Sequence, residues 1–422
     1  MKPDPARAAA FDLVTAALAR RAGLEAALEA PHLAALAPQD RSFARALAMT
    51  TLRRLGPIDA ALGARLARPP PDRVRTILRL GAAQLFFLEV PDYAAVDASV
   101  ALADSERTSR PFKGLVNAVL RSLARERPPP ADPADLAPAW LYARWRAAYG
   151  EPAARAVAAR IAEEPAADLT PRDPADVLAL AEALEAEPLA GGSLRKAGRG
   201  RIEDWPGFAE GRWWVQDAAA AIPARLLVIA PGQAALDMCA APGGKALQLA
   251  AAGARVVALD RSSARLKRLQ ESLARTGLEA EVVAAEAEAW ADPRRFAAVL
   301  LDAPCSSTGT FRRNPDVLWT LRPGDIARLA AVQARLLDAA AERAAPGGRL
   351  VYCVCSLETE EGEGQARAFL RRRPDFKLEP IAAGEGGAPA ASVAPEGWLR
   401  ILPHHLEGGL DGFFVVRFRR DD

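Results

Sequence analysis

The sequence lacks long hydrophobic runs. No stretch of about 18 residues is free of polar side chains, and a helix that crosses a membrane needs such a stretch. The N-terminus also lacks an apolar signal segment, which argues against secretion. We therefore expect a cytoplasmic protein that does not contact a membrane. Its 422 residues are enough for two or three domains.

Cysteine and histidine are scarce. The chain has four cysteines, at positions 239, 305, 353 and 355, and three histidines. So few cysteines in a long chain without a signal peptide are typical of free thiols and not of a disulfide framework. The nearest cysteines form a C-x-C pair, and the histidines do not have the spacing of zinc ligands. We expect no metal site.

The charge is distributed unevenly along the chain. The net charge is +2, but residues 1–127 contain 19 Lys/Arg against 13 Asp/Glu, an excess of +6 that leaves −4 for the rest. A basic module joined to a nearly neutral one fits a nucleic-acid partner. A solvated, arginine-rich surface explains the same charge equally well.

The periodicity of apolar residues predicts three regions. Residues 1–129 are expected to form an all-α domain, because apolar residues recur at helical spacing, as at Ala10, Val14 and Ala17. The prolines at 128–130 are expected to end it. Residues 130–211 are predicted to be a linker or small subdomain with a helix over 139–162.

Residues 212–422 are predicted to form an α/β domain. Apolar strand segments alternate there with amphipathic helices, which predicts a doubly wound, mostly parallel sheet of the Rossmann-like type. Ligands of such sheets bind at the carboxyl ends of the strands. The expected strands are Ala234–Met238, Arg255–Asp260, Glu281–Ala284, Phe296–Asp302, Arg349–Val354 and Phe413–Phe418.

A glycine-containing turn, Asp237–Lys245 (DMCAAPGGK), follows the first of these strands. It lacks the glycine and Ser/Thr positions of a phosphate-binding Walker loop and the GxGxxG pattern of a dinucleotide site. S-adenosylmethionine remains as the predicted cofactor, because it has no phosphate to bind. Asp260 ends the next strand and could bind the ribose hydroxyls, and Glu286 follows the third strand near the adenine side. Each acid alone could equally be a solvated strand terminus.

Two cysteines follow later strands, Cys305 in LDAPCSSTGTF and Cys355 in LVYCVCSLETEEGE. Methylation of cytosine carbon 5 needs a thiolate that adds to carbon 6, and an acid near ring nitrogen 3, for which Asp302 is the candidate. Lys245, Arg312 and Arg313 are positively charged residues that could lower the pKa of the thiol. From these residues alone, either cysteine could be the nucleophile. Cys239 and Cys353 are interpreted as small buried hydrophobes.

These motifs resemble the RNA (cytosine-5) methyltransferase family of the Sun/NOL/NSUN type, and closely its bacterial ribosomal, RsmB/Sun-type branch. The similarity includes WVQDAAA, LDMCAAPGGK, ALDRSSARLKRLQ, LLDAPCSSTGTFRRNPDVLW, YCVCSLETEEGE and LPHHLEGGLDGFF. The helical N-terminus resembles the NusB-type RNA-binding module of that branch. The sequence departs from the family at Val354, where threonine is usual, and at Glu286, where aspartate is usual.

The resemblance implies a role for each site residue. Cys355 would be the nucleophile and Cys305 would aid product release, with Asp302 and Lys245 as further catalytic groups. Arg312 and Arg313 are predicted to contact RNA. The S-adenosylmethionine site would comprise Cys239, Ala240, Ala241, Pro242, Gly243, Gly244, Lys245, Asp260, Glu286 and Asp302.

The expected substrate is small-subunit ribosomal RNA, bound by a monomer. A transfer-RNA methyltransferase would carry the same catalytic motifs, and a non-catalytic RNA-binding assembly factor would keep only the fold. The N-terminal module favours the ribosomal substrate over transfer RNA. Intact Cys305, Cys355 and Asp302 favour an enzyme over an assembly factor. The group that removes the carbon 5 proton stays open between Asp302, the Cys305 thiolate and water.

Overall fold

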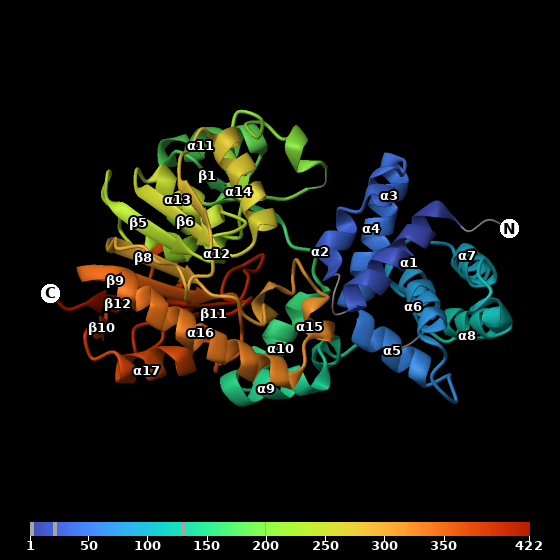
Figure 1. Cartoon of the computed structure of the whole chain (residues 1–422). Coiled ribbons are helices and arrows are strands. Elements are labelled where there is room, and N and C mark those ends of the chain that lie inside the picture. The colour runs from blue at the N-terminus through green and yellow to red at the C-terminus, as the bar shows by residue number, and fades with distance from the viewer. Residues whose placement is uncertain (1–3, 20–22, 128–130, 199) are drawn as a thin grey trace. The chain divides into compact units, whose positions relative to one another are not determined.

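The computed structural model describes residues 4–19, 23–127, 131–198 and 200–422. The chain forms two compact units (Figure 1). One, the helical unit, contains Met1–Glu164 and the inserted segment Phe311–Leu321, and the other, the α/β unit, contains Pro165–Thr310 and Arg322–Asp422. The middle region predicted at 130–211 is therefore shared between the units. The prolines expected to end the first domain lie outside the described residues.

One apolar cluster joins residues 6–123 of the helical unit. Ala10, Val14 and Ala17 of its first helix have no exposed surface, which confirms the helical spacing read from the sequence. Asp4 caps that helix by accepting a hydrogen bond from the backbone N–H of Arg7. The helices are α1 (Pro5–Leu18), α2 (Gly23–Leu28), α3 (Pro31–Ala34), α4 (Pro38–Arg53), α5 (Leu55–Gly63), α6 (Asp72–Phe87), α7 (Asp92–Asp104), α8 (Lys113–Arg125), α9 (Ala139–Tyr149), α10 (Glu151–Ala159) and α15 (Val317–Thr320).

The single helix expected over 139–162 is in fact interrupted. Gly150 separates α9 from α10 and has a backbone φ of +81°, a conformation that glycine adopts without strain. The last residues, Arg160–Ala162, form a 3-10 turn. Apolar periodicity does not reveal this break, because apolar residues are buried at helical spacing on both sides of Gly150.

The main sheet of the α/β unit has the strand order β10-β12-β9-β8-β5-β6-β7, with β11 paired to β12. The pairings among β9, β8, β5, β6 and β7 are parallel, and those of β12 are antiparallel. This confirms the predicted Rossmann-like class. The strands are β5 (Ala234–Met238), β6 (Arg255–Asp260), β7 (Glu281–Ala284), β8 (Phe296–Asp302), β9 (Ala344–Val354), β10 (Phe376–Leu378), β11 (Leu399–Ile401) and β12 (Phe413–Arg420).

Helices cover both faces of this sheet. Alternate residues of a strand point to opposite faces, so Ala235 of β5 packs in one apolar cluster, while Leu236 and Met238 pack in the other. The first cluster includes α12 (Ala218–Arg225), α13 (Gly244–Ala251) and α14 (Ser263–Thr276). The second includes α16 (Pro323–Arg343) and α17 (Glu363–Arg372).

A second, four-stranded antiparallel sheet belongs to the α/β unit, with the order β2-β3-β1-β4. Its strands are β1 (Ala167–Pro171), β2 (Glu187–Pro188), β3 (Leu194–Lys196) and β4 (Trp213–Val215), and α11 (Val177–Leu184) packs with it. Arg195 binds Asp168 through two hydrogen bonds of 2.7 and 2.9 Å. Strands this short show no clear alternation in sequence, which is why they were not predicted.

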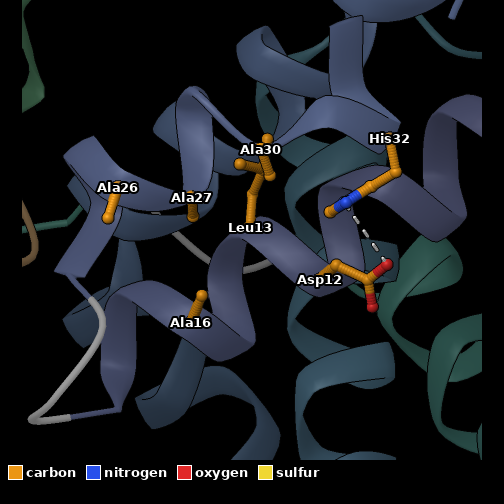
Figure 2. A pocket seen from close by; sticks show the side chains of 7 residues that line it. All are labelled: Asp12, Leu13, Ala16, Ala26, Ala27, Ala30 and His32. Carbon is orange, nitrogen blue, oxygen red and sulfur yellow. Dashed lines mark ion pairs between the residues drawn. The ribbon is translucent and has the colours of Figure 1, made fainter. Parts of the chain in front are cut away.

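The helical unit has a hollow of about 260 Å³ beside α1 (Figure 2). Leucine and alanine side chains form most of its wall, and Asp12 and His32 lie together on one side of it, with 4.0 Å between Oδ2 and Nε2. None of the residues predicted to act in catalysis lines it. Within the described residues, no helix has the length and hydrophobicity needed to span a membrane.

Candidate active site

The carboxyl ends of the parallel strands bring the predicted site residues together. Asp260 and Asp302 are the last residues of β6 and β8, Cys239 follows β5, and Cys355 follows β9. β5 lies between β6 and β8, so the chain order reverses there. Such a switch point opens a crevice at the carboxyl ends of the strands, where ligands of this fold class bind.

The loop after β5 has a tightly constrained backbone. Cys239 and Gly243 have positive φ angles of 62° and 120°. A Cβ added to Gly243 would lie 2.4 Å from Cδ1 of Leu269, so only glycine fits there. The N–H groups of Ala240 and Ala241 donate to the Leu259 carbonyl (3.0 Å) and to Oδ2 of Asp260 (3.1 Å). The loop is thereby joined to the end of β6.

The remaining loop residues and Glu286 differ in exposure. Pro242 is exposed, whereas Gly244 is partly buried and begins α13. A Cβ on Gly244 would lie 3.2 Å from the Gln216 side chain. Glu286 lies two residues beyond β7, and its side chain is exposed. An exposed carboxylate at that edge can reach a bound molecule without first breaking a hydrogen bond within the core.

Asp260 is almost fully buried and anchors three parts of the site. It accepts hydrogen bonds from the N–H of Ala241 and, at 2.8 Å, from the N–H of Ser262. The Arg265 guanidinium lies 3.7 Å from its Oδ2 and also donates to the Ala241 carbonyl. Arg265 is not among the site residues that the sequence motifs indicated. Its position three residues beyond Ser262, the N-cap of α14, was the available signal.

Lys245 and Asp302 form an ion pair in the same crevice. Nζ of Lys245 lies 2.7 Å from Oδ2 of Asp302 and 5.4 Å from the centre of the Phe413 ring. Burial opposes the charge on Lys245, but the Asp302 carboxylate outweighs that effect, so the pKa of Lys245 is raised above its ordinary value. Lys245 is therefore a fixed cation at neutral pH.

Cys305 and Cys355 lie side by side, with 3.4 Å between their sulfur atoms. The hydrogen bond from Cys305 lowers the pKa of Cys355, and Ser307 and Lys245 also lower it, against burial and the charge of Asp302. The same hydrogen bond, together with burial, raises the pKa of Cys305 well above the ordinary value. Because the thiolate is the nucleophilic form of a cysteine, these opposite shifts favour Cys355 over Cys305 as the nucleophile.

The other two cysteines have no such activation. Burial raises the pKa of Cys239 to about 12 and the pKa of Cys353 well above the usual range. Sγ of Cys353 lies 3.6 Å from Oδ1 of Asp302. Raised pKa values agree with the interpretation of both as small buried groups, because a thiol is inert until it ionises.

Asp237, at the start of the predicted loop, has an unusual environment. Its side chain has no exposed surface, and neither oxygen has a hydrogen-bond partner among the described residues. Burial raises its pKa to about 8, so its carboxyl group is mainly protonated at neutral pH. Its place inside the expected strand Ala234–Met238 was the signal in the sequence for this burial.

Arg312 and Arg313 belong to the helical unit. The Arg312 side chain is 2% exposed, and its carbonyl accepts a 2.9 Å hydrogen bond from Arg53. This burial disfavours direct contact between Arg312 and RNA, whereas the exposed Arg313 is better placed for it. Of the three positively charged residues proposed to activate a thiol, Lys245 is the one whose charge lowers the pKa of Cys355.

The fold and the strand-end site together define a methyltransferase-type α/β domain joined to a NusB-like helical domain. Residues 224–419 match the family described as 16S rRNA methyltransferase RsmB/F, and residues 4–125 match the NusB family. The chain is 38% identical over 404 residues to the ribosomal RNA small subunit methyltransferase B of Xanthomonas campestris pv. campestris, covering 91% of this chain and 92% of that protein.

A second relative, also named ribosomal RNA small subunit methyltransferase B, is similar over most of the chain. The protein of the same name from Thermus thermophilus is 39% identical over 391 residues, covering 90% of this chain and 89% of its own. The crystal structure of PH0851 shares the fold, with a TM-score of 0.79, 24% identity and full coverage of both chains. This chain therefore belongs to the RsmB/F methyltransferase family, as its motifs predicted.

Proposed function

We propose that this protein transfers a methyl group from S-adenosylmethionine to carbon 5 of a cytosine in small-subunit ribosomal RNA. The observation that supports this best is the pair of adjacent thiols with opposite pKa shifts, Cys355 lowered and Cys305 raised, 3.4 Å apart. One thiolate and one thiol are what the two halves of the reaction need, first attack and then release. The names of the relatives point to the ribosomal substrate.

The charges of the crevice fit S-adenosylmethionine. Asp260, Asp302 and Glu286 face two cations, and each cation is already paired with a carboxylate: Lys245 with Asp302, and Arg265 with Asp260. This excess of carboxylate disfavours a polyphosphate ligand and favours a cofactor with a cationic sulfonium and an amine. Asp260 would bind the ribose, and the loop from Cys239 to Lys245 would enclose the cofactor. When bound, the cofactor supplies an electrophilic methyl group.

The residues then act in a fixed order. The Cys355 thiolate forms a bond to carbon 6 of the cytosine, which makes carbon 5 nucleophilic enough to take the methyl group. Asp302 hydrogen-bonds the amidine edge of the base and is held by Lys245. Loss of the carbon 5 proton to a base then allows the bond between Cys355 sulfur and carbon 6 to break. Cys305, as a thiol, hydrogen-bonds the departing Cys355 thiolate and so favours release.

The substrate base must leave any stack to reach this crevice, at a cost of a few kcal/mol, so a loop or bulge of the RNA is the expected target. The NusB-like helical unit would supply phosphate contacts that tolerate different sequences. Such contacts weaken with salt, so RNA affinity is expected to fall steeply as ionic strength rises.

The test pairs Cys355→Ala with Cys305→Ala. Each purified variant is incubated with S-adenosylmethionine and unmodified small-subunit RNA and run on a denaturing gel. We expect Cys305→Ala to accumulate a covalent RNA adduct, because release is slowed. Cys355→Ala is expected to give neither adduct nor 5-methylcytosine, because no thiolate is left to add to the ring.

The other outcomes are equally informative. An adduct that persists without Cys355 would reverse the two roles. If the parent protein leaves ribosomal RNA unchanged but methylates transfer RNA, the substrate is transfer RNA instead. Transfer to neither RNA would leave a non-catalytic assembly factor as the better description.

A further inference from the structure

A buried glutamate lies behind the two reactive cysteines. Glu361 follows β9 by a few residues and precedes α17, and its side chain has no exposed surface. A buried carboxylate is costly unless several hydrogen bonds satisfy it. The proposed chemistry does not use Glu361, because it does not contact either sulfur.

Four donors satisfy the Glu361 carboxylate. Ser306 donates twice, from its N–H at 2.9 Å and from its hydroxyl at 2.5 Å. The Ser356 hydroxyl donates at 2.5 Å, and Nε2 of Gln333 donates at 2.9 Å. A carboxylate offers about four acceptor positions, so its capacity is filled by the protein itself.

The two serines are the residues that follow the cysteines. Ser306 is next to Cys305 on the loop after β8, and Ser356 is next to Cys355 on the loop after β9. One carboxylate therefore holds two separate loops, and each hydrogen bond acts one residue away from a sulfur. The serine hydroxyls also lie 3.0 Å from each other.

Other contacts also hold the loop after β9, and one of them joins its backbone to the loop after β8. The guanidinium of Arg400 donates to the Ser356 carbonyl at 2.5 Å and binds Glu363 with two hydrogen bonds of 3.0 and 2.6 Å. The N–H of Gly309 donates to the Cys355 carbonyl at 3.0 Å. These contacts orient the backbone, whereas Glu361 links the residues adjacent to both cysteines.

We propose that Glu361 is a positioning residue that sets the separation of the Cys305 and Cys355 sulfur atoms. Its effect on turnover rests on the proposed function, but its effect on sulfur geometry does not. A carboxylate is required because it only accepts hydrogen bonds. An amide in its place would direct an NH2 group at one of the donors. The serine hydroxyls can reverse their role, but Gln333 could do so only by losing the 2.9 Å hydrogen bond from its Nε2 to the Pro304 carbonyl.

The first measurement needs no RNA. Diamide takes two electrons and two protons from a pair of thiols, which leaves a disulfide and a reduced hydrazine. The rate at which the Cys305–Cys355 disulfide forms is followed by peptide mass spectrometry. It reports how often the two sulfur atoms come into contact. We expect Glu361→Gln to slow it about tenfold or more relative to Glu360→Gln, the matched control on the adjacent exposed residue.

The second measurement is catalytic. Glu361→Gln is expected to lower kcat by about 100-fold, as misplacement of reacting groups by about 1 Å does, with the Kd for S-adenosylmethionine within about twofold of the parent. A merely structural residue would lower cofactor affinity and melting temperature together with kcat. Glu361→Asp, which keeps the charge, should recover part of both the disulfide rate and kcat.

Two results would overturn the proposal. One is a disulfide rate in Glu361→Gln equal to that of Glu360→Gln. The other is a loss of kcat that is fully matched by loss of cofactor binding. If Glu361→Gln does not fold, Ser356→Ala removes a single donor and must still slow the disulfide. A parent that is inactive on RNA while Glu361→Gln slows the disulfide would refute the proposed function and leave this inference standing.

Discussion

The buried charges of the helical unit join its elements, whereas the strand ends of the α/β unit also place buried charges beside a thiol. In the helical unit, Arg79 binds Asp59 with two hydrogen bonds of 2.7 and 2.6 Å, and Arg53 donates to a carbonyl. Each of these charges joins two elements. In the α/β unit, Lys245 and Asp302 meet at strand ends beside Cys355, whose pKa they both change.

The difference shows how a structural charge can be told from a functional one. An ion pair that only joins elements leaves no reactive group with a changed pKa. At the strand ends, a thiol with a lowered pKa and several acids share a small region, so each charge alters the pKa of its neighbours. The predictions below test this contrast by changing similar groups in the two settings.

The largest effect is expected from Lys245→Met. The change leaves Asp302 without its partner and removes a charge that lowers the pKa of Cys355, so kcat/KM for methyl transfer should fall about 100-fold or more. Lys377→Met is the matched control, because Lys377 binds Asp421 at the same 2.7 Å but is 74% exposed. Radiolabelled methyl transfer onto RNA measures both. An equal fall of kcat/KM in the two variants would show that the buried ion pair at the strand ends matters no more for catalysis than an exposed one.

A smaller effect is expected on the ionisation of Cys355. The thiolate persists above its folded pKa and is lost as pH falls through it, and the Cys305 hydrogen bond holds that pKa low. In Cys305→Ala the pKa of Cys355 should therefore rise, and alkylation of Cys355 by iodoacetamide at neutral pH should slow by about tenfold per unit of pKa. Cys305→Ser keeps a donor and should stay closer to the parent. An unchanged pH profile in the alanine variant would contradict this reasoning.

The effect of Asp237 on stability should depend on pH. Its folded pKa of about 8 lies above the ordinary 3.8, so its contribution is fully favourable below about pH 4 and is lost as pH rises towards 8. The asparagine of Asp237→Asn cannot ionise. The melting temperature of this variant relative to the parent should therefore rise as the pH increases from about 5 to about 8. Differential scanning fluorimetry at several pH values measures this difference in melting temperature. A constant difference across that range would show that Asp237 does not titrate.

The smallest effect is expected from a single surface arginine. Arg45 is exposed on α4, near the buried Arg53. If the helical unit binds phosphate groups, Arg45→Ala should weaken RNA binding a few-fold and reduce the slope of log affinity against log salt by about one. Arg328→Ala, exposed on α16 of the α/β unit, is the control. Filter binding at several salt concentrations distinguishes them, and identical slopes would locate the RNA contacts elsewhere.

Much of the fold could be predicted from the sequence. The strands at 234–238, 255–260, 281–284 and 296–302 have the predicted bounds, because buried parallel strands are continuous apolar segments. β9 begins at Ala344, five residues earlier than expected, because its first residues are small or glycine. The four-stranded sheet and the break at Gly150 left too little periodicity to be predicted.

The sequence motifs indicated which residue types stand at the strand ends, but not the contacts between them. The motifs identified Asp260 and Asp302 as residues that end strands and Cys305 and Cys355 as residues that follow them, and parallel pairing brings such residues to one edge. The burial of Arg312 could not be foreseen, because its chain segment joins the helical unit although it follows the DAPC motif of the α/β unit.

The sequence by itself determined the two classes of fold, the strand-end motifs and the membership of the family, because these depend on local patterns of apolar and special residues. Tertiary structure alone decided which cysteine carries the lower pKa and which buried groups act on it. That choice depends on distances between loops about 50 residues apart in sequence, such as the 3.4 Å between the Cys305 and Cys355 sulfur atoms. It also depends on the hydrogen bonds that Glu361 accepts from both loops. Electrostatic and hydrogen-bond effects fall off over a few ångströms in space, and no sequence pattern records that separation.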